Sequence, residues 1–271
     1  MTSTSTSTPT SERHHSSLSY AVRDVVTLAR RNLLALVRIP TALVFMVIQP
    51  VMFVLLFRYV FGGALGSEVP GGQYVNFLIP GILVQTTIFG AVGTAIGLAE
   101  DLQRGLIERF KALPMARMAV LGGRTLADMS RNVLVLVIIT GVGFLVGFRP
   151  HGSFLSYIAA CLVMLLFAYC LSWGFAFVGL AAPNSETAQA MTFPLIFPLT
   201  FASTIFIPLG YLPWWLRGFA NNQPVSEAAD AVRSLMSGTP AGNSVWVTLI
   251  WSVALISVLA PLAVNQFRKV Q

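Results

Sequence analysis

Residues 69–99, "VPGGQYVNFLIPGILVQTTIFGAVGTAIGLA", are followed directly by residues 100–117, "EDLQRGLIERFKALPMAR". The first stretch has no charged side chain, whereas seven of the next 18 residues are charged. An uncharged apolar run of about 18 residues or more indicates a membrane-spanning helix. The abrupt change of composition at Glu100 therefore predicts that a span ends there and that the chain enters water.

Five further runs lack Asp, Glu, Lys and Arg: residues 39–57, 132–148, 152–185, 187–216 and 234–267. Hydrophobic residues make up 55% of the chain and charged residues 10%, and a soluble chain of 271 residues could not bury six such runs. The sequence therefore predicts an all-α integral membrane protein, because helices satisfy their own backbone polar groups in a bilayer. We place the six transmembrane helices at about 41–61, 75–98, 126–148, 154–181, 188–208 and 244–264.

The basic residues are unevenly distributed along the chain. There are 17 Lys and Arg against 10 Asp and Glu, and most of the basic ones lie before the first span, in residues 100–131 and after the last span. Cytoplasmic loops of membrane proteins carry such an excess of Lys and Arg. With six spans, this pattern predicts that both termini and the 100–131 loop face the cytoplasm. It also explains the basic charge without nucleic acid, so no nucleic-acid partner is expected.

The segments at the two ends differ in composition from the spans. Residues 1–18 are rich in Ser and Thr, which predicts a disordered cytoplasmic tail. Residues 19–38 have apolar residues at helical spacing and basic residues opposite, which indicates an amphipathic helix lying flat at the cytoplasmic interface. The alternative is a plain extension of the first span into water. The six-span domain then covers residues 39–267, and residues 268–271 form a cytoplasmic tail.

Residues 209–243, between the fifth and sixth spans, are too polar to cross a bilayer and too apolar for a free loop. Trp214 and Trp215 suit a membrane–water interface. Ser226 has the side chain of an N-cap, and Glu227 beside it favours the N-terminus of a helix. We therefore predict two short helices on the outer face of the membrane.

The sequence has no recognisable catalytic or metal-binding motif. The phosphate-binding pattern G-x-x-x-x-G-K-[ST], the zinc pattern H-E-x-x-H and the nucleophile pattern G-x-S-x-G do not occur. No acidic residue lies near the centre of a predicted span, so a proton or ion relay lacks its carboxylate. We therefore expect no catalytic residue and no metal site, and any energy source must be a partner.

The charged segment after the second span has its own periodicity. Leu102, Leu106, Phe110 and Leu113 recur at i, i+4, i+8 and i+11, which predicts a short amphipathic helix with one apolar face. Pro114 ends the pattern. Two interpretations remain open. The segment is either a solvated loop whose charge keeps it inside, or a helix that docks into a partner's groove with its charges setting the orientation.

Residues 100–132, "EDLQRGLIERFKALPMARMAVLGGRTLADMSRN", resemble the loop of the ABC type-2 permease family, in its daunorubicin-resistance branch. The positions that carry the resemblance are Asp101, Gly105, Glu108-Arg109-Phe110-Lys111, Leu113-Pro114-Met115, Arg117, Gly123-Arg124 and Ala127-Asp128. It continues through residues 49–64, 147–150, 183–203 and 223–235. The resemblance therefore covers nearly the whole chain after position 20.

The resemblance implies a transport role. The chain would be the non-catalytic permease of an ATP-driven exporter in a bacterial plasma membrane, with no bound cofactor of its own. ATP and Mg²⁺ would bind to a separate cytoplasmic ATPase subunit, and two permeases, identical or related, would assemble with two ATPases. The substrates would be amphipathic molecules such as antibiotic-like drugs or lipids, and membrane lipid would be a further partner of the chain.

The resemblance also implies where the ATPase binds. The loop after the second span would be the coupling helix. Its residues are Glu100, Asp101, Leu102, Gly105, Leu106, Glu108, Arg109, Phe110, Lys111, Leu113, Pro114 and Arg117. The N-terminal amphipathic helix and the turn at 182–190 would make a secondary contact, through Asn184, Ser185 and Glu186 in the turn.

A substrate path is indicated by polar and aromatic residues near the middle of the first, second and fifth spans. These residues are Gln49, Gln85, Thr86, Thr87, Thr192, Phe193 and Phe197. Polar side chains inside a membrane usually face the bundle interior or a cavity. The alternative is that they bond neighbouring helices and touch no substrate.

A second function is compatible with the same loop. The chain could be a membrane anchor that recruits an ATPase for another purpose and transports nothing. The two functions differ in one observable, which is ATP-dependent movement of a substrate across the membrane.

Overall fold

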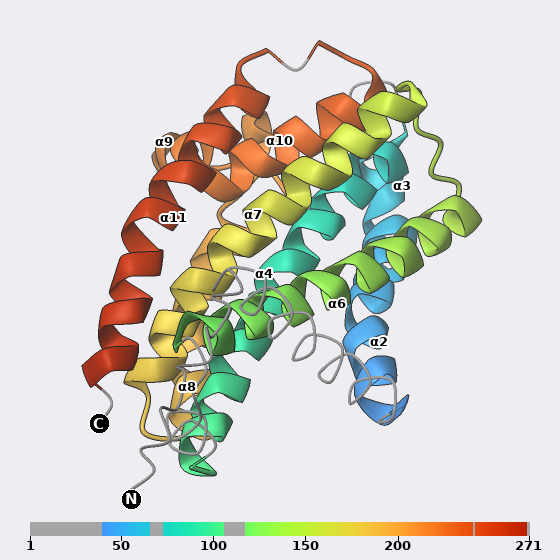
Figure 1. The fold of residues 1–271 in the computed structure, drawn as a ribbon. Helices are drawn as coiled ribbons and strands as arrows, with labels where there is room; N and C mark the ends of the chain where they lie inside the picture. Colours follow the sequence, from blue (N-terminus) through green and yellow to red (C-terminus); the bar gives the residue numbers. More distant parts are fainter. Residues whose placement is uncertain (1–39, 66–72, 106–116, 241, 270–271) are drawn as a thin grey trace, which may run out of the picture.

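The computed structural model describes residues 40–65, 73–105, 117–240 and 242–269 (Figure 1). Within these ranges every regular element is helical, which confirms the predicted all-α class. The predicted tail 1–18, the amphipathic helix 19–38 and residues 106–116 of the coupling segment lie outside the described residues. The elements are α2 (Pro40–Leu56), the π-helical turn η1 (Phe57–Phe61), α3 (Gly62–Leu65), α4 (Tyr74–Gln103), α6 (Arg117–Val146), α7 (Phe154–Ala181), α8 (Ser185–Phe201), the 3₁₀ turn η3 (Leu209–Tyr211), α9 (Trp214–Asn222), α10 (Pro224–Ser237) and α11 (Ser244–Lys269).

Helix α4 forms the centre of the bundle. It packs most extensively against α7, and further against α8, α6 and α10. In the most apolar 18-residue stretch of α4, 61% of the residues are buried inside the protein, whereas 17% are buried in the corresponding stretch of α11. Helix α11 packs along α7 at the edge of the bundle (Figure 1). The side chains of α4 therefore mostly contact other helices, whereas α11 presents apolar residues to its surroundings.

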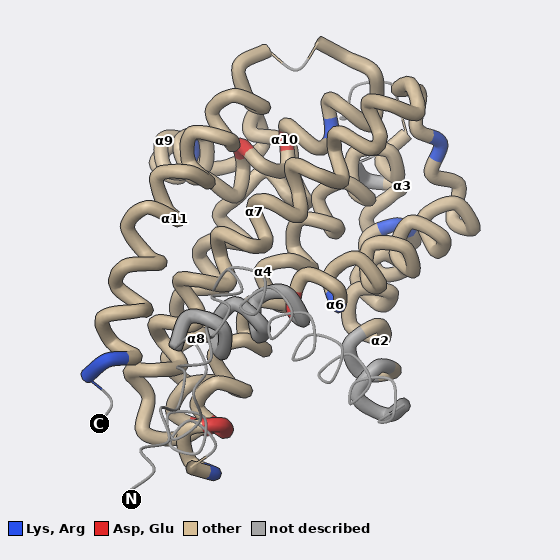
Figure 2. Tube along the Cα trace, in the orientation of Figure 1, with Lys and Arg blue, Asp and Glu red and all other residues tan. Residues whose placement is uncertain are grey.

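Four helices in the described residues are long and apolar enough to cross a membrane. They are α4, Asp128–Val146 of α6, α7 and α11, and they correspond to the second, third, fourth and sixth predicted spans. Charged residues are sparse along α7 and α11 (Figure 2). Large apolar side chains such as Leu145, Leu162 and Trp246 are exposed on the outside of the bundle. Such a surface is suited to lipid rather than water.

The helix of the first predicted span continues further than expected. Helix α2 passes Pro50 and continues through η1 and α3 to Leu65, beyond residue 61 where the predicted span ends. The Phe57 ring stacks on Phe53 at 6.0 Å and on Phe206 at 4.4 Å between ring centroids. These aromatic contacts hold the end of the first helix against the segment that follows α8.

The helix of the fifth predicted span ends before residue 208. Helix α8 stops at Phe201, and its 17 residues extend about 25 Å, less than the roughly 30 Å of a bilayer core. Residues 202–208 continue in largely irregular backbone, with 203–206 buried. Irregular backbone at membrane depth is tolerated where protein covers it. Here α10 covers it, since Thr204 N donates to Ser226 Oγ at 3.1 Å.

Arg233 of α10 joins three parts of the bundle. Its Nε donates to Phe77 O of α4 at 3.2 Å and its Nη2 to Thr204 O at 2.9 Å, while Nη1 pairs with Asp230. Its guanidinium carbon lies 3.7 Å from the centroid of the Phe77 ring. Desolvation raises the pKa of Asp230 and lowers that of Arg233, and the attraction between the two charges opposes both shifts. We call Arg233, Asp230, Thr204 and Phe77 the α10 clamp.

The second of the two short helices begins earlier than predicted. Helix α10 starts at Pro224 and its N-cap is Gln223, so the assignment of Ser226 as the N-cap was wrong. Proline suits the first helical position because its φ is already helical and it has no N–H that needs a partner. Ser226 is instead buried in the first turn, where its hydroxyl accepts the hydrogen bond from Thr204.

Candidate functional site

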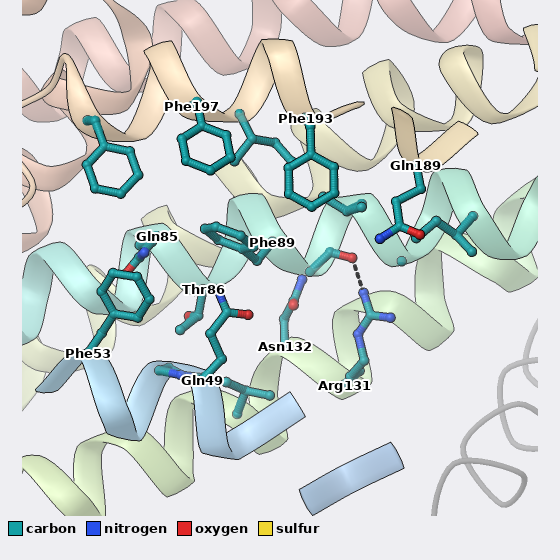
Figure 3. A pocket seen from close by; sticks show the side chains of 18 residues that line it. Gln49, Phe53, Gln85, Thr86, Phe89, Arg131, Asn132, Gln189, Phe193 and Phe197 are labelled. Atoms are coloured by element: carbon teal, nitrogen blue, oxygen red, sulfur yellow. Dashed lines mark hydrogen bonds between the residues drawn. The ribbon is translucent and has the colours of Figure 1, made fainter. Parts of the chain in front are cut away.

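A cavity of about 540 Å³ lies between α2, α4, α6 and α8 (Figure 3). This volume falls in the range of roughly 300–1,000 Å³ that is typical of small-molecule sites. The lining residues are Gln49, Pro50 and Phe53 of α2; Gln85, Thr86, Phe89, Gly90, Val92, Gly93 and Ile96 of α4; Arg131, Asn132 and Val135 of α6; and Gln189, Phe193, Ile196, Phe197 and Phe201 of α8. We call it the inner cavity.

Phenylalanines form much of the apolar wall. Phe193, Phe197 and Phe201 repeat every four residues along one face of α8, with ring centroids 5.9 and 5.5 Å apart. Figure 3 shows Phe193 and Phe197 pointing from α8 toward α4, where Phe89 lies, with Phe53 of α2 nearby. Aromatic faces of this kind suit stacking against flat rings.

Four carboxamide side chains line the same cavity: Gln49, Gln85, Asn132 and Gln189. None of them forms a side-chain hydrogen bond with another residue in the described part of the chain. Gln49 and Gln189 are exposed, whereas Asn132 is buried and Gln85 is only 2% exposed. Both polar atoms of the Gln85 amide are buried and unpartnered. A buried polar group without a partner costs about 1–3 kcal/mol.

An ion pair on α6 borders the cavity. Arg131 Nη2 lies 3.3 Å from Asp128 Oδ1 and also donates to Gly90 O of α4, which Figure 3 marks by a dashed line. Thr94 of α4 donates its hydroxyl hydrogen to Asp128 Oδ2. Both charged side chains are largely buried, at 14% exposure for Arg131 and 8% for Asp128. The pair therefore ties the first half of α6 to the second half of α4.

Two glycines on α4 allow α4 and α6 to approach each other closely at this contact. A Cβ atom on Gly93 would lie 2.6 Å from Arg131 Nη1, and one on Gly90 would lie 2.6 Å from Asn132 Oδ1. Side chains at these two positions would push the polar residues of α6 away from α4. The sequence spacing Gly90-x-x-Gly93 thus creates the room that Arg131 and Asn132 occupy.

Replacing Arg131 with glutamine is expected to lower the free energy of unfolding by about 2 kcal/mol, because Asp128 would keep a buried charge without its cation. Unfolding of the purified protein in lipid nanodiscs measures the effect. The double variant D128N/R131Q should recover part of the loss, and a double variant as unstable as R131Q would contradict the pairing. As a control, R104Q removes an exposed pair with Glu100 and should cost less than about 0.5 kcal/mol.

Five of the seven residues predicted for a substrate path line the inner cavity: Gln49, Gln85, Thr86, Phe193 and Phe197. Thr87 and Thr192 do not. Their hydroxyls donate to Val84 O and Gln189 O of their own helices, at 2.8 and 2.7 Å, and both side chains are buried. These two threonines do not face the inner cavity, and they bond the backbone of their own helices and not the neighbouring helices that the alternative named.

The sequence analysis missed Arg131, Asn132, Phe53 and Phe89 as lining residues. Arg131 had been grouped with the cytoplasmic basic residues because it ends a charged stretch of sequence. The predicted third span, about 126–148, already contained Arg131, but only the tertiary structure shows that it bonds Gly90 O of α4 and lines the cavity. The one available signal was the glycine pair on α4, which indicates close helix packing but does not name the partner.

The predicted coupling segment begins with a break in the helix. Helix α4 ends at Gln103, and Gly105 has a φ of +65°, so the single helical face predicted from Leu102 to Leu113 is interrupted at this glycine. Leu102 belongs to α4 and packs against the cluster that contains Leu98, Trp173 and Phe267. Leu106, Glu108, Arg109, Phe110, Lys111, Leu113 and Pro114 lie outside the described residues, and Arg117 is the first residue of α6.

The turn before α8 contains the three residues predicted for a secondary contact. Asn184 is the N-cap of α8 and its Oδ1 accepts from Thr187 N at 2.6 Å, so this side chain has a structural role. Ser185 is the first helical residue, and Glu186 is exposed in the first turn, where its charge suits the helix N-terminus. In the described part of the chain no group of three or more His, Cys, Asp or Glu is placed to hold a metal ion.

The chain is similar in sequence to known membrane transport proteins. The profile of the family described as ABC-2 type transporter matches residues 23–237. The chain is 35% identical over 248 residues to the daunorubicin resistance ABC transporter permease protein DrrB1 of Streptomyces coeruleorubidus, covering 92% of this chain and 87% of that protein. It is 26% identical over 223 residues to the probable doxorubicin resistance ABC transporter permease protein DrrC of Mycobacterium tuberculosis, with 82% and 80% covered.

A third relative comes from a different kind of organism. The putative transport permease ycf38 of Cyanophora paradoxa is 25% identical over 225 residues, covering 80% of this chain and 76% of the relative. The family profile spans the described helices from α2 to α10, including the elements that form the inner cavity. With its apolar helices, the chain is a multi-pass membrane protein, and it belongs to the ABC-2 type transporter family of permeases.

Proposed function

We propose that this chain is the permease subunit of an ATP-driven exporter that moves amphipathic, drug-like molecules out across the plasma membrane. The observation that carries the proposal is the inner cavity, because it places aromatic and hydrogen-bonding side chains together among helices of a transporter family. The names of the relatives, which refer to daunorubicin and doxorubicin resistance, support a drug-like cargo over a lipid.

We further propose how the energy of ATP reaches the cavity. A separate ATPase subunit, carrying ATP and Mg²⁺, would bind residues 100–117 and contact Glu186 as well. Helices α4 and α6 flank this segment and both line the inner cavity. The Arg131 contact to Gly90 O and the ion pair with Asp128 connect the two helices between the segment and the cavity. A displacement of the segment would therefore move two cavity walls together.

The proposed assembly has two permeases, identical or related, with two ATPases. Each permease would cross the membrane six times with both termini in the cytoplasm, α2 to α3 and α8 providing the two spans besides the four long apolar helices. Helices α9 and α10 would then lie at the outer face. The exposed Trp214 and Trp215 on α9 support this, since tryptophan favours the membrane–water interface.

Reconstitution tests the transport role directly. The full-length permease and its ATPase partner, placed in inside-out vesicles, should accumulate a fluorescent aromatic amphipath such as daunorubicin when Mg-ATP is added. Vesicles with ADP, or with an ATPase that binds but cannot hydrolyse ATP, provide the baseline. ATPase binding without any ATP-dependent accumulation across a panel of amphipaths would favour the membrane-anchor function instead.

Changing Phe110 to aspartate is expected to abolish ATPase association while the permease still inserts in the membrane, because a charge would replace an apolar contact of the proposed coupling segment. Co-purification of the two subunits measures this. The matched control is Trp214→Asp, which places the same charge at an exposed position of α9, outside the proposed coupling segment. Equal ATPase recovery with both variants would rule out the coupling role.

A further inference from the structure

We propose that Arg58, in the π-helical turn η1, binds the phosphate group of an anionic phospholipid in the outer leaflet of the membrane. Arg58 does not line the inner cavity, so this site is independent of what the exporter carries. The choice of leaflet rests on the topology proposed above, in which the first span runs from the cytoplasm outwards.

Arg58 is a cation without a partner inside a predicted span. Among the described residues it forms no hydrogen bond and no ion pair, and its Nε is buried without a partner. A charged side chain at membrane depth is costly, and such residues almost always pair with another group. Its two Nη nitrogens are not among the buried atoms that lack a partner, and the residue is partly exposed. A ligand outside the bundle can therefore reach the guanidinium.

The other described arginines that the topology places toward the outer face are satisfied by the protein itself. Arg149 and Arg217 each donate to backbone carbonyl groups close to them in the chain. Arg233 pairs with Asp230 and donates to two further carbonyls. Arg58 differs from these three because its N–H groups remain available for a ligand.

The guanidinium determines the chemistry of that ligand. Its planar N–H donors match the two oxygens of a carboxylate or a phosphate. In the described outer helices the carboxylates are those of α10, where Asp230 pairs with Arg233 and Glu227 accepts a hydrogen bond from Ser244. These two groups are therefore engaged within their own chain, which favours a phosphate over a carboxylate from a second copy.

The surroundings of Arg58 favour a phospholipid over a free phosphate. The next two residues, Tyr59 and Val60, are 71% and 67% exposed, so they offer apolar surface to acyl chains beside the cation. Arg58 lies three residues before the predicted end of its span, about 5 Å along a helix, and a long arginine side chain can extend to the interface from there. Figure 1 shows α3, which follows η1, in the half of the bundle that holds α9 and α10.

Native mass spectrometry of the complex of permease and ATPase tests this site without ATP or cargo. Two lipids are added separately at equal concentration: dioleoylphosphatidylglycerol, which is anionic, and dioleoylphosphatidylcholine, which has the same chains and no net charge. We expect Arg58→Met to lose one tightly bound phosphatidylglycerol per permease, with an affinity about tenfold lower at this site, because a charge-assisted bidentate contact is lost. Retention of phosphatidylcholine should change less.

Two variants control for folding and for net charge. Arg58→Lys keeps the charge and loses the planar fork, so its affinity should fall about threefold, and it replaces Arg58→Met if that variant fails to insert. Arg217→Met removes the same charge from an exposed arginine that already bonds carbonyls, and it should retain the lipid. Glycerol 3-phosphate, which has no acyl chains, should not displace the lipid at the same concentration.

Three results would overturn the proposal. Unchanged lipid retention in Arg58→Met would remove the site, and weaker crosslinking between two permeases in that variant would assign Arg58 to a carboxylate of the second permease. An equal loss in Arg217→Met would reduce the effect to net charge. Displacement by glycerol 3-phosphate would make the ligand a free phosphate compound. Each of these results leaves the exporter function standing, and a failure of ATP-driven accumulation leaves the lipid site standing.

Discussion

Replacing Arg233 with methionine is expected to lower the free energy of unfolding by about 3 kcal/mol, because breaking a buried ion pair leaves an uncompensated charge. We take the lower end of the range for such pairs because the Asp230 side chain is 42% exposed. The variant also loses the hydrogen bonds to Phe77 O and Thr204 O. Thermal unfolding in nanodiscs measures the change.

Two further variants test the source of this loss. D230N alone should cost less than R233M, because the arginine keeps its two backbone acceptors. Arg217→Met is the matched control: this exposed arginine bonds only carbonyls of the turn before it, Leu212 O and Gly210 O, so we expect a change of about 0.5 kcal/mol or less. If R233M and R217M were equally stable, the α10 clamp would not hold the irregular segment 202–208 in place.

Replacing Gly179 with alanine is the second change with a large expected effect, about 3 kcal/mol of lost stability. A Cβ atom at this position of α7 would lie 2.4 Å from Ala95 O and 2.8 Å from Ala95 Cα of α4. These are backbone atoms, so no side-chain rotation relieves the clash. Helices α4 and α7 would have to move apart along the most extensive helix contact in the bundle. The yield of folded protein and its unfolding temperature both report the loss.

Two other glycines give a graded comparison by the same measurement. At Gly174 of α7 the added Cβ would lie 3.1 Å from Leu259 Cδ1, a flexible side chain, so Gly174→Ala should cost less than Gly179→Ala. At Gly141 of α6 nothing lies within 4 Å, and the change should stay within about 0.5 kcal/mol. Equal stability of the Gly141 and Gly179 variants would show that backbone contact does not set the spacing of α4 and α7.

The sequence alone was sufficient for the fold class and for most helix positions. Charged residues are costly inside a bilayer, so membrane-spanning helices appear in the sequence as uncharged runs. This cost depends on the composition of each segment and not on which helices pack beside it. The same reasoning placed α7 and α11 well, because both are apolar nearly throughout. It was weaker where a helix carries charge into the bundle, as α6 does at Asp128 and Arg131.

The candidate site was predicted in part. Gln49, Gln85, Thr86, Phe193 and Phe197 were found because polar or aromatic residues in a span indicate an interior-facing surface, and they do line the inner cavity. Periodicity could not separate them from Thr87 and Thr192. All three threonines bond the backbone of their own helix, and only the coordinates show that Thr86 also lines the cavity whereas Thr87 and Thr192 do not.

Composition by itself determined that this chain forms apolar helices long enough to cross a membrane, because the cost of moving charge from water into lipid excludes charged residues from such helices. Only the tertiary structure decided where a helix ends before its uncharged run of sequence does. Helix α8 ends at Phe201 because Ser226 and Arg233 of α10 satisfy the backbone that follows it. It also decided that four carboxamides from four helices meet around one cavity with their hydrogen bonds unmade, since convergence of this kind depends on helix packing and leaves no trace in local sequence.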